Sequence, residues 1–344
     1  MVRIEHKRAL MVFRFGDKKF EWPIETRYWR NPILGIGLLA LLPIVFSGRP
    51  DALSLIATAN IYACIAIPLA WQMTGIGRLN FGPQAFVGIG GFIAALASVH
   101  FGWGPWATLP FAILGGLFFG FIFSPLTNIA KGLYFSLITL IIPLIFLEIT
   151  YYFSIFKGET GLYGIAPLVN VSSIKAEYII TGYMALIMMV IFLFVVVKVF
   201  DSRIGLYSAA INDDEEVANN LGLNIKRWKI ISFVITSTMV AVAGWFAAHY
   251  FGTFSGVTYL QLPFMLKILL MVMIGGRGDV YGAVYGAYFV VILEKALTVV
   301  GLAHYILFPL ILLILLFALK EGIYGLYRMH RYREYYPTIR VRKR

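Results

Sequence analysis

Long uninterrupted apolar segments dominate this sequence and most restrict what it can fold into. Each approaches the roughly 20 residues that an α-helix needs to cross a bilayer. Ten such segments occur, at about 31–47, 53–72, 83–101, 106–126, 133–156, 178–199, 230–251, 261–275, 280–300 and 303–320. Charged residues make up only 13% of the chain, against about a quarter in soluble domains. We therefore expect an all-α polytopic membrane protein with about ten transmembrane segments.

The eighth segment, 261–275, is short and precedes the glycine-rich stretch GGRGDVYGAVYGAYF. The eighth and ninth segments form either two ordinary spans or a re-entrant, broken pair. A broken pair is tolerated only where its backbone is buried in protein or lines a cavity.

Glycines at every fourth position let helix backbones approach closely, either within this chain or against a partner chain. The glycines with this spacing are Gly278, Gly282 and Gly286, and the pair Gly116 and Gly120.

Basic residues indicate how the segments are oriented. If the N-terminus is cytoplasmic, 24 of the 29 lysines and arginines fall on the inner side, and cytoplasmic loops generally carry such an excess. The exceptions are Arg49, Lys157 and Lys175 in outer loops, and Lys267 and Lys295 within spans. We therefore expect a multi-pass protein of the cell membrane with both termini in the cytoplasm.

The same charges divide the chain into three parts. A basic cytoplasmic segment covers 1–30, the membrane domain covers 31–320, and a basic cytoplasmic tail covers 321–344. The net charge of +12 follows from this topology and from contact with anionic lipid headgroups. The lipid bilayer is thus the expected partner of these charges, and nucleic acid is not.

The sequence lacks the residues that several functional classes need. Cys64 is the sole cysteine, which excludes a disulfide framework and a cysteine-based zinc site. His100, His249 and His304 stand alone at segment ends, where an interfacial side chain is the expected role rather than a metal ligand. No G-x-x-x-x-G-K-[ST] motif is present to cradle ATP phosphates. We expect no cofactor or metal on this chain, so transport would need a separate ATPase or an ion gradient.

The connection at 201–229 is long and charged, and it falls on the cytoplasmic side. Asn212 is expected to be the N-cap of a helix, with acidic residues in its first turn and Glu215 at the third position. Gly222 suits the left-handed residue that ends a helix. The predicted helix is therefore Asp213 to Leu221, with one small apolar face made by Val217, Ala218 and Leu221.

So short a helix is marginal on its own in water and needs a surface on which to dock. That surface is either a protein partner or the membrane domain of this same chain, and local sequence leaves both open. Lys226, Arg227 and Lys229 follow the helix and are expected to anchor the next span at the inner membrane interface.

The stretch EVANNLG, from Glu216 to Gly222, resembles the E-A-A-x-x-x-G signature of ABC importer permeases, with Val217 in place of the first alanine. The longer stretch GLYSAAINDDEEVANNLGLNIKRWKIISFVITSTMVAVAGWFAAHY resembles the branched-chain amino-acid permease family of the LivM type, which includes urea permeases. Three other stretches agree with this family in order: TGIGRLNFGPQAFVGIGGFIAAL, KGLYFSLITL and MVMIGGRGDVYGAVYGAYFVVILE. The resemblance covers roughly residues 50–300.

This resemblance implies an ABC importer permease fold and a subunit that moves branched-chain amino acids or a related small solute. It also implies partners: a homologous second permease, two ATP-binding subunits that hold ATP and Mg²⁺, and an extracytoplasmic solute-binding protein. In the family, the E-A-A loop docks into a groove on the ATPase. The residues that this assigns to ATPase coupling here are Ala210, Asp213, Asp214, Glu215, Glu216, Val217, Ala218, Leu221 and Gly222.

Polar residues within the spans are costly and are therefore candidates for the solute pathway. They are Gln72, Thr74, Asn80, Gln84, Glu148 and Lys267. Glu148 and Lys267 would suit the two charges of an amino acid, but an internal ion pair between two spans would explain such residues as well. Asn80, Pro83 and Gln84 depart from the residues usual in the family, as does the run Gly278-Asp279-Val280, so the resemblance does not identify the solute.

Two other functional classes need residues that this sequence does not offer. A secondary transporter needs carboxylates within the membrane and repeat symmetry, but the sequence offers one such carboxylate, Glu148, and no clear inverted repeat. An intramembrane enzyme needs a cluster of catalytic or metal-binding side chains, and no such cluster is visible. The sequence therefore favours a transport subunit without an ATPase site of its own.

Overall fold

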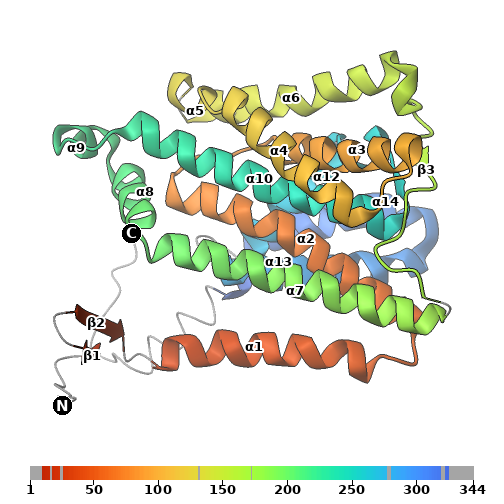
Figure 1. The fold of residues 1–344 in the computed structure, drawn as a ribbon, viewed down its shortest axis with the longest axis horizontal. Helices are drawn as coiled ribbons and strands as arrows, with labels where there is room; N and C mark the ends of the chain where they lie inside the picture. Colours follow the sequence, from red (N-terminus) through yellow and green to blue (C-terminus); the bar gives the residue numbers. More distant parts are fainter. Residues whose placement is uncertain are drawn as a thin grey trace.

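The computed structural model shows a bundle of long helices with two short two-stranded sheets (Figure 1). It describes residues 10–324 except 16–17, 24–25, 131, 172, 277–279 and 319–321. The long helices are α1 (Thr26–Val45), α2 (Pro50–Gly75), α3 (Pro83–Phe101), α4 (Pro105–Phe123), α6 (Leu133–Tyr152), α7 (Ile174–Phe200), α10 (Ile225–Phe251), α12 (Leu262–Gly275), α13 (Val280–Leu297) and α14 (His304–Ala318).

Short elements precede or connect the long helices. They are β1 (Leu10–Phe15), β2 (Lys18–Pro23), α5 (Leu126–Ile129), η1 (Ser154–Phe156), β3 (Leu162–Tyr163), α8 (Arg203–Asp213), α9 (Glu215–Asn220), β4 (Thr253–Phe254), α11 (Gly256–Tyr259) and η2 (Thr298–Ala303). The strands pair antiparallel, β1 with β2 and β3 with β4. In Figure 1, α8 and α9 lie at one end of the bundle and β3 lies at the other.

The predicted class, an all-α polytopic membrane protein, is confirmed. Among the described residues, eight helical stretches are long and apolar enough to cross a bilayer, and a shorter apolar helix covers Ile306–Leu316. Each of the ten predicted segments coincides with a long helix, although the count of ten spans stays a prediction. The eighth and ninth segments lie in the stretches Gly256–Gly275 and Val280–Gly301, each long enough to span. The first stretch is not one continuous helix, because Leu260 and Gln261 interrupt it between α11 and the 14-residue α12. Two ordinary spans and a broken pair therefore both stay predictions.

Helix α10 is the centre of the packing, since it lies against α2, α3 and α4, while α2 also packs against α7 and α13. Glycines allow these close crossings. A Cβ on Gly90 of α3 would lie 1.8 Å from the carbonyl oxygen of Ala241 in α10. Gly116 of α4 also faces α10, where its Cβ would lie 2.8 Å from the Cα of Thr238, and Gly120 faces Ser237 one turn further along.

Glycines also join α12 to α13. A Cβ on Gly286 would lie 1.9 Å from the carbonyl oxygen of Met271, and a Cβ on Gly282 would lie 3.0 Å from Gly275. These glycines therefore pack helices within this chain. Gly278, the third glycine of the predicted repeat, lies outside the described residues.

Candidate functional site

The predicted cytoplasmic helix is present, but it begins later than the sequence indicated. It is α9, Glu215–Asn220, and its N-cap is Asp214, whose carboxylate accepts hydrogen bonds from the backbone N–H of Glu216 and Val217 at 2.9 and 3.0 Å. The prediction of Asn212 as the cap, with helix from Asp213, was wrong. Helix α8 continues through Asp213, and the extended backbone at Asp214 separates it from α9. Asn212 therefore lies inside α8, and its side-chain N–H donates to the carbonyl of Thr74 instead of capping α9.

The end of α9 agrees with the prediction. Gly222 has a φ of 83°, a left-handed conformation that glycine adopts without strain. The N–H of Leu223 donates to the carbonyl of Ala218 at 3.2 Å, and the N–H of Gly222 donates to that of Asn219 at 2.9 Å. This pair of bonds is a Schellman motif, which satisfies the last carbonyls of the helix and turns the chain sharply toward α10.

The three apolar residues of α9 do not form one face, contrary to the prediction. Ala218 is buried, with 2% of its surface exposed, whereas Val217 is 52% and Leu221 is 76% exposed. The small alanine packs inward because α9 lies close to its own protein, and the two larger side chains point away from it. Helix α9 therefore both rests on this chain and presents apolar surface outward.

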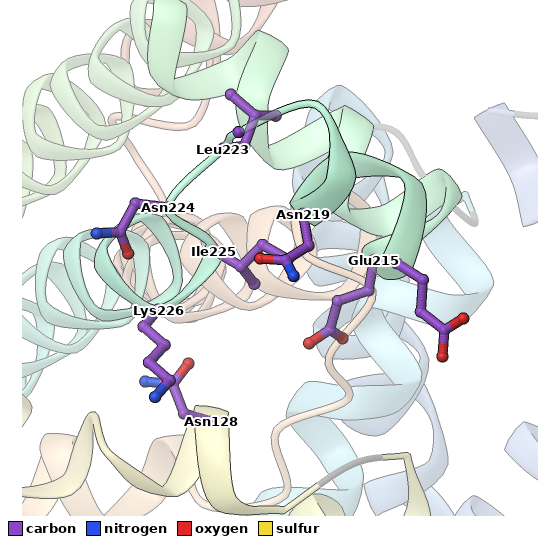
Figure 2. Close-up of a pocket in the computed structure, with 9 residues that line it drawn as sticks. Asn128, Glu215, Asn219, Leu223, Asn224, Ile225 and Lys226 are labelled. Atoms are coloured by element: carbon purple, nitrogen blue, oxygen red, sulfur yellow. The ribbon is translucent and has the colours of Figure 1, made fainter.

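The remaining residues assigned to coupling lie mostly on the surface. Ala210 is half-buried on α8, while Asp213, Asp214, Glu216 and Gly222 are exposed. A hollow of about 530 Å³ adjoins them, lined by α9, the first turn of α10 and the end of α5 (Figure 2). Asn128 closes one side of this hollow, and nothing in the sequence indicated that it would lie there.

Glu215 differs from its neighbours because it is paired inside the protein. Its Oε2 accepts a hydrogen bond from the Arg78 guanidinium at 3.1 Å, and its Oε1 accepts one from the Lys229 ammonium at 2.6 Å. Lys229 is only 1% exposed, so the expectation that it anchors α10 at the membrane interface was wrong. One carboxylate thus joins α9 to the α2–α3 connection and to α10, a contact that no local pattern indicated.

A buried polar cluster follows directly inward from Arg78. Gln72 donates to the hydroxyl of Thr236 and accepts from the side-chain N–H of Asn80 at 2.9 Å. Asn80 in turn accepts from the backbone N–H of Gly82 at 2.7 Å. Thr74 is not part of this network, because its hydroxyl donates to the carbonyl of Ala70. The cluster ties α2 to α10 and fixes the loop that leads into α3.

Gln84 lies near this cluster in sequence, but its side chain takes no part in the hydrogen bonds of the cluster. It is fully buried, and neither its Nε2 nor its Oε1 has a hydrogen-bond partner among the described residues. The hydroxyl of Ser237 is likewise buried without a partner in that part of the chain. The cavity between Gln72, Asn80 and Ser237 is only about 10 Å³, so the candidate pathway residues at this end are closed around almost no free space.

The two charged pathway candidates are not brought together. The Lys267 ammonium donates to Glu294 at 2.6 Å, which joins α12 to α13, and it lies 5.2 Å from the ring centre of Tyr62. Glu148 is exposed on α6. The internal ion pair that the sequence left open therefore exists for Lys267, but its partner is Glu294. Among the described residues, no group of three or more His, Cys, Asp or Glu side chains could hold a metal.

Replacing Lys267 with methionine is expected to lower the free energy of unfolding by about 1–3 kcal/mol, because Glu294 would keep a mostly covered carboxylate without this cation. Replacing Glu294 with leucine as well should recover most of that loss. Thermal unfolding of the purified variants measures both effects. Lys175→Met, at an exposed position, serves as the control, and a Lys267→Met variant that unfolds like this control would contradict the structural role of the pair.

Comparison with known proteins gives three results. The family model described as "Branched-chain amino acid transport system / permease component" matches residues 52–319. The high-affinity branched-chain amino acid transport system permease protein LivM of Salmonella typhimurium is 26% identical over 74% of this chain and 66% of its own length, and LivM of Escherichia coli is 26% identical over 67% and 60%. LivH of Escherichia coli is 27% identical over 45% of this chain and 49% of its own. No solved structure matches the chain.

The LivM matches cover 74% and 67% of this chain but less than two thirds of the LivM relatives' own lengths. The residues matched by the family model include the whole region from α8 to α10 and all of the polar residues discussed above, since they run from within α2 to the end of α14. The basic N-terminal segment and the β1–β2 hairpin fall outside the matched residues.

Proposed function

Because the chain belongs to the branched-chain amino acid transport permease family, we propose that it is the membrane-spanning subunit of an ATP-driven importer. Its solute would be a branched-chain amino acid or a related small polar molecule. The proposal places the chain in the cell membrane with both termini, α8 and α9 in the cytoplasm, since basic residues gather on that side. It leaves ATP and Mg²⁺ to separate ATPase subunits.

The observation that carries this proposal is the form of α9. The helix is held firmly at both ends, by the Asp214 cap and by the Schellman motif at Gly222, yet it exposes Val217 and Leu221. A rigid short helix with outward apolar side chains and an adjoining hollow is suited to docking in a groove of a partner protein. The E-V-A-N-N-L-G sequence of α9 matches the family's ATPase-docking signature at Glu216, Ala218 and Gly222.

The remaining partners follow from the proposed system. Relatives named LivM and LivH are both permease proteins of a branched-chain amino acid transport system, which supports a second, homologous permease beside this chain. Two ATP-binding subunits and an extracytoplasmic solute-binding protein complete the proposed importer. An ion-coupled transporter remains the alternative, and reconstituted uptake driven by a gradient through this chain alone would establish it.

Glu216→Arg is expected to reduce both ATPase co-purification and ATP-dependent leucine uptake by about tenfold or more. A like charge at a docking contact costs several kcal/mol, and each loss of about 1.4 kcal/mol weakens binding tenfold. Gly222→Asp should act in the same direction, since it adds a charge to the same surface. Both are measured on the complex purified from membranes and reconstituted in vesicles.

Glu159→Arg is the matched control, because it makes the same charge change at an exposed position near the opposite end of the bundle. It should leave ATPase co-purification unchanged. Full uptake by the Glu216→Arg and Gly222→Asp variants would refute the assignment of α9 to ATPase docking.

A further inference from the structure

We propose that Glu215 transmits the movement of α9 to the buried Gln72–Asn80–Thr236 cluster, and that this cluster is the cytoplasmic gate of the solute pathway. The inference rests on the proposed function. It divides the two adjacent glutamates of α9 between different tasks. Glu216 faces outward to the ATPase, and Glu215 faces inward as a positioning residue for the gate.

The first support is that Glu215 joins the same two parts of the chain that the cluster joins. Its carboxylate binds Arg78, in the connection after α2, and Lys229, near the start of α10. Further inward, Gln72 of α2 donates to Thr236 of α10. The ion triad Arg78–Glu215–Lys229 and the polar cluster therefore form two successive contacts that join α2 and its following loop to α10.

The second support is the short path from Arg78 to the cluster. Asn80 lies two residues after Arg78 and holds both Gln72 and the backbone of Gly82. A displacement of Arg78 therefore moves a side chain that is bonded directly to Gln72. The connection carries few residues that could absorb the movement, since α2 ends at Gly75 and α3 begins at Pro83.

The third support is a second attachment of the α8–α9 region to the same end of α2. The side-chain N–H of Asn212 donates to the carbonyl of Thr74 at 3.0 Å. A Cβ on Gly77 would lie within 2.1 Å of the Asn212 side chain, so the two segments are in close contact. Helix α9 cannot shift as a rigid unit with the end of α8 without acting on residues 74–78.

The charges of the triad explain how a movement of α9 reaches both α10 and the α2–α3 connection. Two cations, Arg78 with 8% and Lys229 with 1% of the side chain exposed, lie on the same carboxylate. If α9 moves outward with a partner, the Glu215 carboxylate moves with it and pulls on both cations. Separating largely buried ion pairs is costly, so the movement is passed on to the α2–α3 connection and to α10, and from there to the Gln72–Thr236 contact.

The test compares Glu215→Gln with Glu216→Gln in the complex of the permease with its ATPase subunits. Both substitutions remove one negative charge from α9 and keep the side-chain length. We expect Glu215→Gln to keep the ATPase bound and hydrolysing ATP while leucine uptake falls about tenfold or more, as when one coupling contact is lost. Glu216→Gln should instead lower ATPase binding and uptake together.

A second measurement reports the gate itself. Leu69→Cys of α2 and Val240→Cys of α10, made together with Cys64→Ala, place two cysteines on the small cavity beside the cluster and leave the cluster itself intact. With Glu215 in place, ATP and Mg²⁺ should change the yield of the disulfide between them, and with Glu215→Gln the yield should no longer respond. Arg78→Gln removes the other end of the contact and should cause the same loss of response. It takes the place of Glu215→Gln if that variant accumulates poorly.

The outcomes separate this inference from the proposed function. If no ATPase subunit binds the unaltered permease, the proposed function fails. If the ATPase binds and drives uptake but Glu215→Gln and Arg78→Gln keep uptake and the nucleotide-dependent disulfide yield, the inference is overturned. Equal losses of ATPase binding in Glu215→Gln and Glu216→Gln would overturn it as well, because Glu215 would then act in docking.

Discussion

Gly286→Val is expected to prevent folded protein from accumulating in the membrane. A Cβ at this position would lie 1.9 Å from the carbonyl oxygen of Met271 and 2.9 Å from the Cα of Gly275. Both are backbone atoms of α12, so no side-chain rotation can make room. The valine would have to force α12 and α13 apart along the whole crossing, where a Cβ on Gly275 would likewise lie 1.9 Å from the carbonyl oxygen of Gly282.

The expected cost is larger than that of ordinary overpacking, which is about 1–3 kcal/mol, because the obstacle is backbone. Separating the helices would also uncouple the Lys267–Glu294 pair, which joins the same two helices. Yield of monodisperse protein in detergent and its thermal unfolding measure the effect. We expect little or no folded protein.

Gly182→Val is the matched control for this experiment. Gly182 also lies within a long helix, α7, and a Cβ there would meet no atom of the described residues within 4 Å. The two variants therefore share the helix-propensity cost of valine and differ in the space around it. Equal yield and equal unfolding of the two variants would contradict the close α12–α13 crossing.

The helices themselves were predictable because bilayer crossing demands long apolar segments, and each predicted segment coincides with a helix. The helix boundaries were less predictable, since α2 begins at Pro50 and α7 at Ile174, each a few residues before the expected start. Glycine spacing indicated that Gly282 and Gly286 lie at a close crossing. It could not identify Gly275 of α12 as the partner, because periodicity defines a face of a helix but not what that face meets.

The candidate site divides in the same way. The left-handed end of α9 at Gly222 follows from local backbone chemistry, and that part of the prediction was correct. The pairing of Glu215 with Arg78 joins residues 137 positions apart, and no local rule bears on it. The same limit explains Lys267, whose partner Glu294 lies on the next helix, and Lys229, which a charge count places at the membrane interface but tertiary packing buries.

Gln84→Met is expected to stabilise the protein and at the same time impair uptake. Gln84 is fully buried, and its carboxamide has no hydrogen-bond partner among the described residues. A buried polar group without a partner costs about 1–3 kcal/mol, and methionine of similar length removes that cost without leaving a cavity. We therefore expect the midpoint of thermal unfolding to rise.

A residue that costs stability in one conformation is commonly kept for what it does in another. Gln84 lies at the start of α3, two residues after the loop that Asn80 holds closed. If the cluster opens during transport, the free carboxamide is positioned to meet a polar solute or its water. Leucine uptake by Gln84→Met should therefore fall although the protein is more stable, which separates this residue from a packing position.

Gln72→Met makes the same substitution at a residue whose carboxamide is bonded, donating to Thr236 and accepting from Asn80. It should lower the unfolding midpoint, because the side chains of its partners stay buried and lose their bonds. The opposite signs at positions 72 and 84 are the decisive result. If Gln84→Met destabilises the protein as Gln72→Met does, the Gln84 carboxamide is bonded in the folded state. If Gln84→Met leaves uptake unchanged, Gln84 does not serve the pathway.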